Sequence, residues 1–205
     1  MEVGKLLPYF RPGHCDNCFL SYELYLASEP IVTDSGVFDY SPGKWRDYFR
    51  STKSHNTIII NETEQNRTWG SFRILANGKA QTIYTDDSKI KAQNTSYQKR
   101  YKTNHIRKCI LDTEQNKINV TDLIPYSKKL TKIENNIHLS SHLIFTKTYK
   151  IDNTTIYCFK GEKSYFEIGI SNKNELNIEL TSSYESKTFG KKLKRPNIKI
   201  TQEKI

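Results

Sequence analysis

Thr57-Ile58-Ile59-Ile60 is the strongest structural signal in this chain. All four residues are β-branched, and branching at Cβ favours extended backbone over helix. A run that is apolar at successive positions is typical of a strand buried on both faces. We therefore expect a buried β-strand at this point, with the rest of a sheet built around it.

Short apolar or alternating segments lie on both sides of this run, and helical periodicity is nearly absent. In Ser21–Leu26, for example, Tyr22, Leu24 and Leu26 would share one face. Many short strands with turn-forming residues between them predict an all-β fold, a sandwich or a barrel, in one domain spanning residues 1–205. The other expected strands are the apolar segment that ends at Asp34, Ala80–Tyr84, Ile106–Leu111, Ile118–Leu123, Ile137–Ile144, Thr155–Phe159, Tyr165–Ile170 and Leu176–Leu180.

The charge balance favours an anionic partner. The 205 residues contain 32 Lys and Arg against 22 Asp and Glu, a net charge of +10, which suits nucleic acid, an acidic membrane surface or an acidic polysaccharide. Residues 187–205 hold seven basic and one acidic side chain, or +6 of that excess, and we expect them to form a final strand with a loose, solvated basic end. Nucleic acid is disfavoured because no RNP-like motif, zinc finger or Arg-rich helix is present. No apolar run approaches the length of a membrane span, and the first residues are no secretory signal.

One cluster of reactive side chains precedes the Ser21 segment. His14, Asp16 and Cys18 stand at alternate positions, so they would share one face if the backbone is extended. All three are zinc-competent ligands, although a polar strand entrance is the simpler interpretation. Cys15 and Cys18 form a C-x-x-C pair, but a strand follows rather than the helix of a redox motif.

Two further clusters follow. Asp34 ends an apolar strand, where it is either a functional carboxylate at a sheet rim or a turn former. The segment Trp45–Thr57 combines Arg, aromatic residues, His and Asn ahead of the buried strand. Arginine with aromatic platforms suits sugar carboxylates or phosphates, whereas the alternative is a long hairpin loop with ordinary surface charge.

Together these clusters resemble the C-terminal β-sandwich domain of the heparinase II/III-like polysaccharide lyases. The resemblance runs through nearly the whole chain, and the Arg50–Asn56 block is its most specific part. The matching motifs are Pro12-Gly13-His14-Cys15-Asp16 with Leu20-Ser21-Tyr22-Glu23-Leu24, then Asp34-Ser35-Gly36, Tyr48-Phe49-Arg50-Ser51-Thr52 with His55-Asn56-Thr57, and Gln65 with Trp69-Gly70-Ser71-Phe72-Arg73. It implies an antiparallel β-sandwich of the heparinase II/III C-terminal type.

The resemblance also implies β-elimination on uronic-acid-containing polysaccharide. In such a reaction a base removes the proton beside the carboxylate and the negative charge must be stabilised. The implied catalytic residue is His14, the implied substrate-binding residues are Tyr48, Arg50 and Asn56, and the implied ligands of a divalent metal, usually zinc, are Asp16, Asp34 and His55. Asp16 replaces a family histidine, which makes the ligand set harder and more anionic, and Cys18 is a further possible ligand.

Family members also carry an N-terminal α/α toroid, whereas this chain starts only 13 residues before His14. We therefore expect the sandwich part of a lyase, truncated at its N-terminus relative to the family and inactive without a toroid domain or a partner chain that supplies one. The resemblance implies a periplasmic or secreted protein. The alternative is a non-catalytic glycan-binding domain or an accessory domain of surface-polysaccharide biosynthesis.

Overall fold

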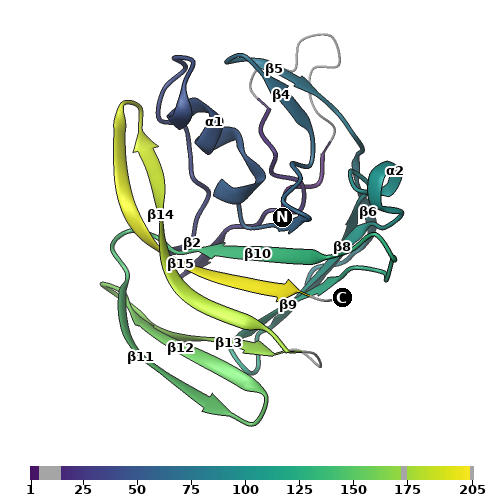
Figure 1. Ribbon diagram of the computed structural model, residues 1–205. Helices are drawn as coiled ribbons and strands as arrows, with labels where there is room; N and C mark the ends of the chain where they lie inside the picture. Colours follow the sequence, from purple (N-terminus) through teal and green to yellow (C-terminus); the bar gives the residue numbers. More distant parts are fainter. Residues whose placement is uncertain (5–14, 172–174, 204–205) are drawn as a thin grey trace.

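The structure, a computed structural model, describes residues 1–4, 15–171 and 175–203. Most of them lie in strands, which curve around a common centre (Figure 1). His14 lies outside the described residues. The strands are β1 Leu24–Leu26, β2 Glu29–Val32, β3 Ile58–Ile60, β4 Arg67–Trp69, β5 Arg73–Leu75, β6 Ala80–Thr85, β7 Lys89–Asn94, β8 His105–Asp112, β9 Lys117–Leu123, β10 Lys132–His138, β11 Ile144–Ile151, β12 Thr154–Lys160, β13 Tyr165–Ser171, β14 Asn177–Thr188 and β15 Lys191–Glu203.

The strands form three sheets and two separate hairpins. One sheet has the order β14-β15-β10-β3, a second is β11-β12-β13, and a third is the meander β6-β7-β8-β9. The hairpins are β1-β2 and β4-β5. Every pairing between these described strands is antiparallel. The expectation of an all-β antiparallel sandwich is therefore confirmed.

The β-branched run is a buried strand, as its sequence predicts. Ile58, Ile59 and Ile60 are all buried in β3, which pairs with β10 at one edge of its sheet. Tyr97 and Tyr101, just before and within the short helix α2 (Gln98–Tyr101), pack in the same apolar cluster. The edge strand is thus covered, and water does not reach its apolar side chains.

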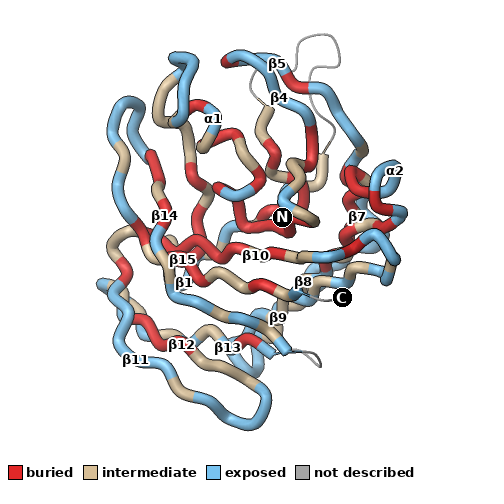
Figure 2. The backbone as a smooth tube through the Cα atoms, in the orientation of Figure 1, coloured by how far each residue is buried: buried red, intermediate tan, exposed pale blue. Residues whose placement is uncertain are grey.

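The main core lies between the β14-β15-β10-β3 sheet and the β11-β12-β13 sheet. Ile137 of β10 and Ile198 of β15 pack with Tyr157 and Phe159 of β12. Ile31 and Val32 of β2 join the same cluster. In Figure 2 the buried segments of the two sheets face each other across this layer. Two sheets that bury their inner faces against each other define a sandwich.

Two expected strands have different bounds. The segment Ile137–Ile144 is not one strand, because β10 ends at His138 and β11 begins at Ile144. Between them the chain turns, with the amide of Leu143 donating to the Ser140 carbonyl at 3.1 Å, and passes from one sheet to the other. The Ser21–Leu26 expectation was also too long, since only Leu24–Leu26 forms a strand and Leu26 is exposed.

The expected final strand of the Lys-rich C-terminal segment is confirmed as β15, which runs to Glu203, so most of that basic segment is ordered rather than loose. β15 pairs with β14 on one side and with β10 on the other, so it is an inner strand. Its residues Arg195, Asn197 and Ile198 are buried. Pro196 is tolerated just beyond the last residue pair between β10 and β15, where its carbonyl still accepts from the Leu139 amide at 3.0 Å.

Three short helical segments interrupt the strands. They are α1 (Lys44–Arg50), the single 3-10 turn η1 (Thr52–Ser54) and α2. The α1 helix stands where the sequence suggested a long hairpin loop, and at seven residues it is too short to show a clear helical period. Among the described residues, no helix combines the length and apolar character needed to cross a bilayer.

Candidate functional site

Most of the predicted site residues converge around the end of β2, beneath α1 and η1. We call the residues Asp16, Asp34, Arg50, His55 and Asn56 the polar centre. Its position depends on local backbone chemistry: the amide of Gly36 donates to Asp34 Oδ1 at 2.9 Å, which turns the chain directly after β2. Gly36 has a φ of 71° and a Cβ there would collide with the Ser186 carbonyl, so this turn needs glycine.

Asp34 and His55 form the central ion pair. His55 Nδ1 lies 2.6 Å from Asp34 Oδ2, and the imidazole is buried. Burial alone would raise the pKa of Asp34, but the charge and hydrogen bond of His55 lower it to about 2. Burial likewise opposes the charged form of His55, yet Asp34 raises the pKa of His55 above its ordinary value. Both shifts favour the ionised pair.

Asn56 is buried, and both polar atoms of its side chain form hydrogen bonds to backbone atoms. Its side-chain amide donates to the carbonyls of Tyr22 and Thr33, both at 3.0 Å. Its side-chain oxygen accepts from the His138 amide at 2.7 Å. Asn56 therefore ties the start of the β1-β2 hairpin, the end of β2 and the end of β10 together. Its predicted role in substrate binding stays a prediction.

Arg50 also directs its donors into the protein. It donates to the carbonyl of Gly70 at 2.9 Å and to that of Arg73 at 3.1 Å, which fixes the β4-β5 hairpin onto α1. A third donor reaches the Cys15 carbonyl at 3.4 Å, and its Nε lies 3.4 Å from Asp16 Oδ1. Only 2% of the surface of Arg50 is exposed, and its terminal nitrogens donate to backbone carbonyls, while its buried Nε has no hydrogen-bond partner.

Tyr48 lies on another side of α1. Its hydroxyl accepts from the Tyr184 amide of β14 at 3.0 Å, and its ring packs edge-on against Trp45 and Tyr184. The residue joins α1 to the long β14-β15 hairpin. The structure thus places Tyr48 outside the Asp34–His55 pair, and its substrate-binding role stays a prediction.

Asp16 and Cys18 lie close enough to the ion pair to respond to its charges. Burial raises the pKa of Asp16, and His55, Arg46 and Arg50 only partly oppose this shift. Burial and the charges of Asp34, Glu2 and Asp16 raise the pKa of Cys18 well above its ordinary value. Cys18 is consequently a neutral thiol here, and a thiolate is the form that binds metal.

The fit of a divalent metal can be tested on these contacts. Two buried atoms, His55 Nε2 and Asp16 Oδ1, have no hydrogen-bond partner, as unused ligand atoms would. However, Asp34 is paired with His55 and Asp16 faces Arg50. Across residues 1–4, 15–171 and 175–203, no group of three or more His, Cys, Asp or Glu side chains is arranged to hold a metal ion. The described donors do not fit a zinc site, and no step below depends on one.

Sequence reasoning missed two buried arginines that hold the centre in place. Arg195 of β15 donates to the backbone oxygens of Thr33 and Asp34, at 2.9 and 3.0 Å, and to that of Ser54 at 3.3 Å. It therefore clamps the strand end that carries Asp34 to the turn that carries His55. The only sequence signal is the alternation of Ile198 and Ile200 farther along the same strand.

Arg107 of β8 is the second buried arginine that holds the polar centre in place. It makes two hydrogen bonds to Asp122, at 2.7 and 2.9 Å, and donates to the carbonyls of Leu20 and Asn56. His105 Nε2 also contacts Asp122, at 2.6 Å. The neighbouring meander is thereby attached to the backbone of the polar centre.

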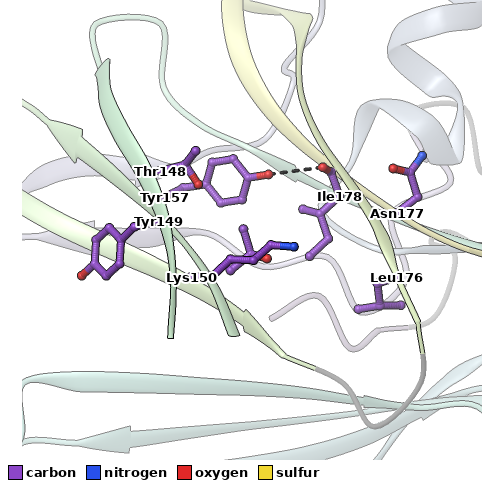
Figure 3. A pocket seen from close by; sticks show the side chains of 8 residues that line it. Thr148, Tyr149, Lys150, Tyr157, Leu176, Asn177 and Ile178 are labelled. Carbon is purple, nitrogen blue, oxygen red and sulfur yellow. Dashed lines mark hydrogen bonds between the residues drawn. The ribbon is translucent and has the colours of Figure 1, made fainter. Parts of the chain in front are cut away.

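A separate hollow lies on another part of the fold, between the β11-β12 hairpin and the start of β14 (Figure 3). Tyr157 points across it and donates to the Ile178 carbonyl at 3.3 Å. Its lining residues are Thr148, Tyr149, Lys150, Thr155, Tyr157, Leu176, Asn177 and Ile178. None of the predicted site residues is among them.

The comparisons with known proteins can now be set beside this geometry. The chain is similar to the crystal structure of heparan sulfate lyase HepC from Pedobacter heparinus, with 18% identity and a TM-score of 0.62 over 93% of this chain and 29% of that one. It is also similar to a heparinase III gene product, with 15% identity and a TM-score of 0.64 over 93% of this chain and 28% of that one. At these identities the likeness concerns the fold, and this chain spans less than a third of either protein. Curated protein sequences gave no match.

The sequence itself matches a protein family over almost all of its length. The matching family is described as heparinase II/III-like, C-terminal, and the match covers residues 1–200. The same residues carry the sandwich, the Asp34–His55 pair and the α1 segment. The resemblance read from the motifs is confirmed, and this chain belongs to the heparinase II/III-like C-terminal family.

Proposed function

We propose that this chain is the β-sandwich part of a lyase that cleaves uronic-acid-containing polysaccharide by β-elimination. The proposal rests on family membership and on one structural observation, the contact between Asp34 and His55 at the point where the family motifs converge. The similar structures, named as a heparan sulfate lyase and a heparinase III, support the same class of substrate.

The chemistry explains why a buried ion pair beside arginines suits such a site. The proton beside a uronate carboxylate is weakly acidic, so negative charge develops as a base removes it, and fixed positive charge lowers the barrier. The pair keeps His55 in its charged form, and Arg50 and Arg195 place two more cations nearby. In this proposal His14 takes part in proton transfer, next to a backbone position, Cys15, that Arg50 holds.

The proposal assigns the remaining catalytic groups of the cleft to a second structural unit. The chain spans about 29% of the length of the HepC structure, and the proposal is that an α/α toroid, in the same protein or in a partner, provides the other wall of the cleft. The proposed setting is the periplasm or the cell exterior, where such polysaccharides occur.

A second candidate function is favoured by the inward orientation of Arg50 and Asn56. If Arg50 and Asn56 only stabilise the fold and do not contact substrate, the chain would bind acidic glycan without cleaving it. The two functions differ in product formation, so one assay separates them.

The test is to incubate the chain with heparan sulfate, alginate, hyaluronan and polygalacturonate, alone and with an α/α-toroid protein added, and to follow the ultraviolet absorbance of the unsaturated uronate product. We expect product in at least one combination and its loss in His55→Ala, with Tyr126→Ala as an exposed control. Glycan binding without product in every combination would refute the lyase and establish the binding domain.

A further inference from the structure

We propose that an exposed aromatic surface beside α1 binds the acidic polysaccharide chain, with rings stacking on sugar faces and lysines pairing with carboxylate or sulfate groups. We call this surface the aromatic patch, and it consists of the exposed Tyr40, Phe72 and Phe189 together with the half-buried Phe38 and Trp45. The inference rests on the substrate class of the proposed function, and it adds where on this chain that substrate binds.

Three segments that are far apart in the sequence build the patch. The Tyr40 ring lies 5.4 Å from Phe72, in the turn of the β4-β5 hairpin, and 5.4 Å from Phe189, in the turn of the β14-β15 hairpin. Figure 1 shows both hairpins and α1 at the same end of the molecule. Tyr40, Phe72 and Phe189 remain 38%, 46% and 61% exposed. Solvent-accessible rings of this kind offer flat apolar faces to a ligand.

The rings are held in place rather than left on free loops. Arg46 donates to the Ser71 carbonyl at 2.8 Å, and its guanidinium lies 5.1 Å from the Tyr40 ring and 5.8 Å from the Phe72 ring. The Gly190 amide donates to the Phe38 carbonyl at 2.7 Å, which fixes the β14-β15 turn. A surface that is already ordered loses little entropy when a ligand binds.

Cations border the rings, and this charge selects an anionic ligand. Lys192 lies 4.5 Å above the Trp45 ring and 4.6 Å above the Phe38 ring, while Lys44 lies 5.5 Å above Trp45. The acidic side chains close to the rings in sequence are Asp39 and Asp47, and on the β14-β15 hairpin Glu185 is buried and paired with Lys187. Purely apolar rings would suit a protein partner equally well, but rings flanked by lysines complement a chain of acidic sugars.

The patch is accessible to solvent, whereas the polar centre is largely closed. Arg50 and Asn56 are both buried, and their terminal nitrogens donate to backbone carbonyls. The patch adjoins that centre through the β4-β5 hairpin, which Arg46 and Arg50 both hold. Accessible rings and lysines beside a closed centre are the features expected of a surface that grips a long glycan.

The test is calorimetric titration of the folded chain with size-defined heparan sulfate oligosaccharides, and with neutral dextran as the uncharged comparison. Phe72→Ala and Phe189→Ala should each weaken the affinity for the acidic glycan about tenfold, since each removes a stacking face. Lys192→Ala should weaken it about threefold and reduce its salt dependence. The matched controls are Tyr126→Ala and Lys128→Ala, which change exposed residues of the same kinds on a different loop.

Each other outcome has a definite meaning. Unchanged affinity in the three patch variants, no acidic-glycan binding by the unmodified chain, or equal binding of dextran would overturn the inference. A dimer that Phe189→Ala converts to a monomer would also overturn it, by showing the patch to be an interface between copies. Patch-dependent binding without unsaturated product would leave this inference standing and refute only the lyase activity.

Discussion

The polar centre and the aromatic patch both contact the β4-β5 hairpin, and they use their cations in opposite ways. In the centre, Arg50 and Arg195 are buried and bond mainly to backbone carbonyls. In the patch, Lys192 and Lys44 lie over aromatic rings near solvent. This contrast between buried arginines and lysines near solvent shows that formal charge alone does not identify a binding surface in this chain. Buried arginine fixes the fold, whereas Lys44 and the half-buried Lys192 border a patch in which three rings are exposed to solvent.

The largest expected effect comes from replacing Arg195, which links the strand end at Asp34 to the turn that carries His55. Arg195→Met should lower the free energy of unfolding by about 3–5 kcal/mol, because it removes the donor to several buried carbonyls and one of the two cations beside the buried Glu185. Lys194→Met, an exposed change in the same strand, should stay within about 0.5 kcal/mol. Urea unfolding measures both, and equal effects would show that Arg195 is not a structural clamp.

The next effect concerns the amide that joins three segments. Asn56→Ala should cost about 3 kcal/mol, since it removes the side-chain partner of the Tyr22 carbonyl and of the His138 amide, and one of the two donors to the Thr33 carbonyl. Asn177→Ala removes an exposed asparagine whose side chain bonds only Glu179, and it should be nearly neutral. An equally mild Asn56→Ala would argue that the residue is kept for substrate rather than for the fold.

A smaller effect follows from the ion pair, because the Asp34 side chain keeps 39% of its surface exposed and solvent screens it. The pKa of Asp34 falls from 3.8 to about 2 on folding, so its stabilisation is present above about pH 4 and is lost as the pH falls toward 2. The pKa of His55 rises above 6.5, so its stabilisation is present below that pH and fades as the pH rises further.

The stability difference between the unmodified chain and Asp34→Asn should therefore be largest between about pH 4 and pH 6.5, at about 1 kcal/mol. Thermal unfolding at a series of pH values measures it, with Asp87→Asn as an exposed control. A difference that is flat across the whole range would mean that the two groups do not form an ion pair.

Removal of divalent ions should have the smallest effect on the fold. The described residues of the centre hold one another by direct contacts, so dialysis against a chelator should change the melting temperature by less than about 2 °C. Zinc-dependent folds instead lose most of their stability on chelation. A drop of several degrees, restored by zinc, would contradict the structural account of the centre.

Much of the fold was readable from the sequence because strand signals are local. The run Thr57–Ile60 and the alternating segments that became β6, β8, β9, β12 and β13 show the expected periods. The boundary between β10 and β11 was not readable, because the apolar residues Leu139 and Leu143 continue into a buried connection between sheets. Burial follows from tertiary contacts there rather than from a strand period.

The candidate site was readable only in part, for a related reason. The motif residues Asp34 and His55 do meet, although 21 positions separate them. Arg195 was not foreseen, since within a Lys-rich segment one more basic residue looks solvated. Nor was the patch, because Phe72 and Phe189 meet around Tyr40 only after two hairpins fold onto α1.

The most direct test of the claim that the centre serves the fold and the patch serves the ligand is one paired measurement on Phe189→Ala and Asn56→Ala. For each variant, unfolding free energy and affinity for heparan sulfate are determined on the same preparation. We expect Phe189→Ala to keep its stability within about 0.5 kcal/mol and to lose about tenfold in affinity. Asn56→Ala should lose about 3 kcal/mol of stability while its folded fraction binds normally. The reverse pattern, with affinity lost in Asn56→Ala and kept in Phe189→Ala, would contradict the account.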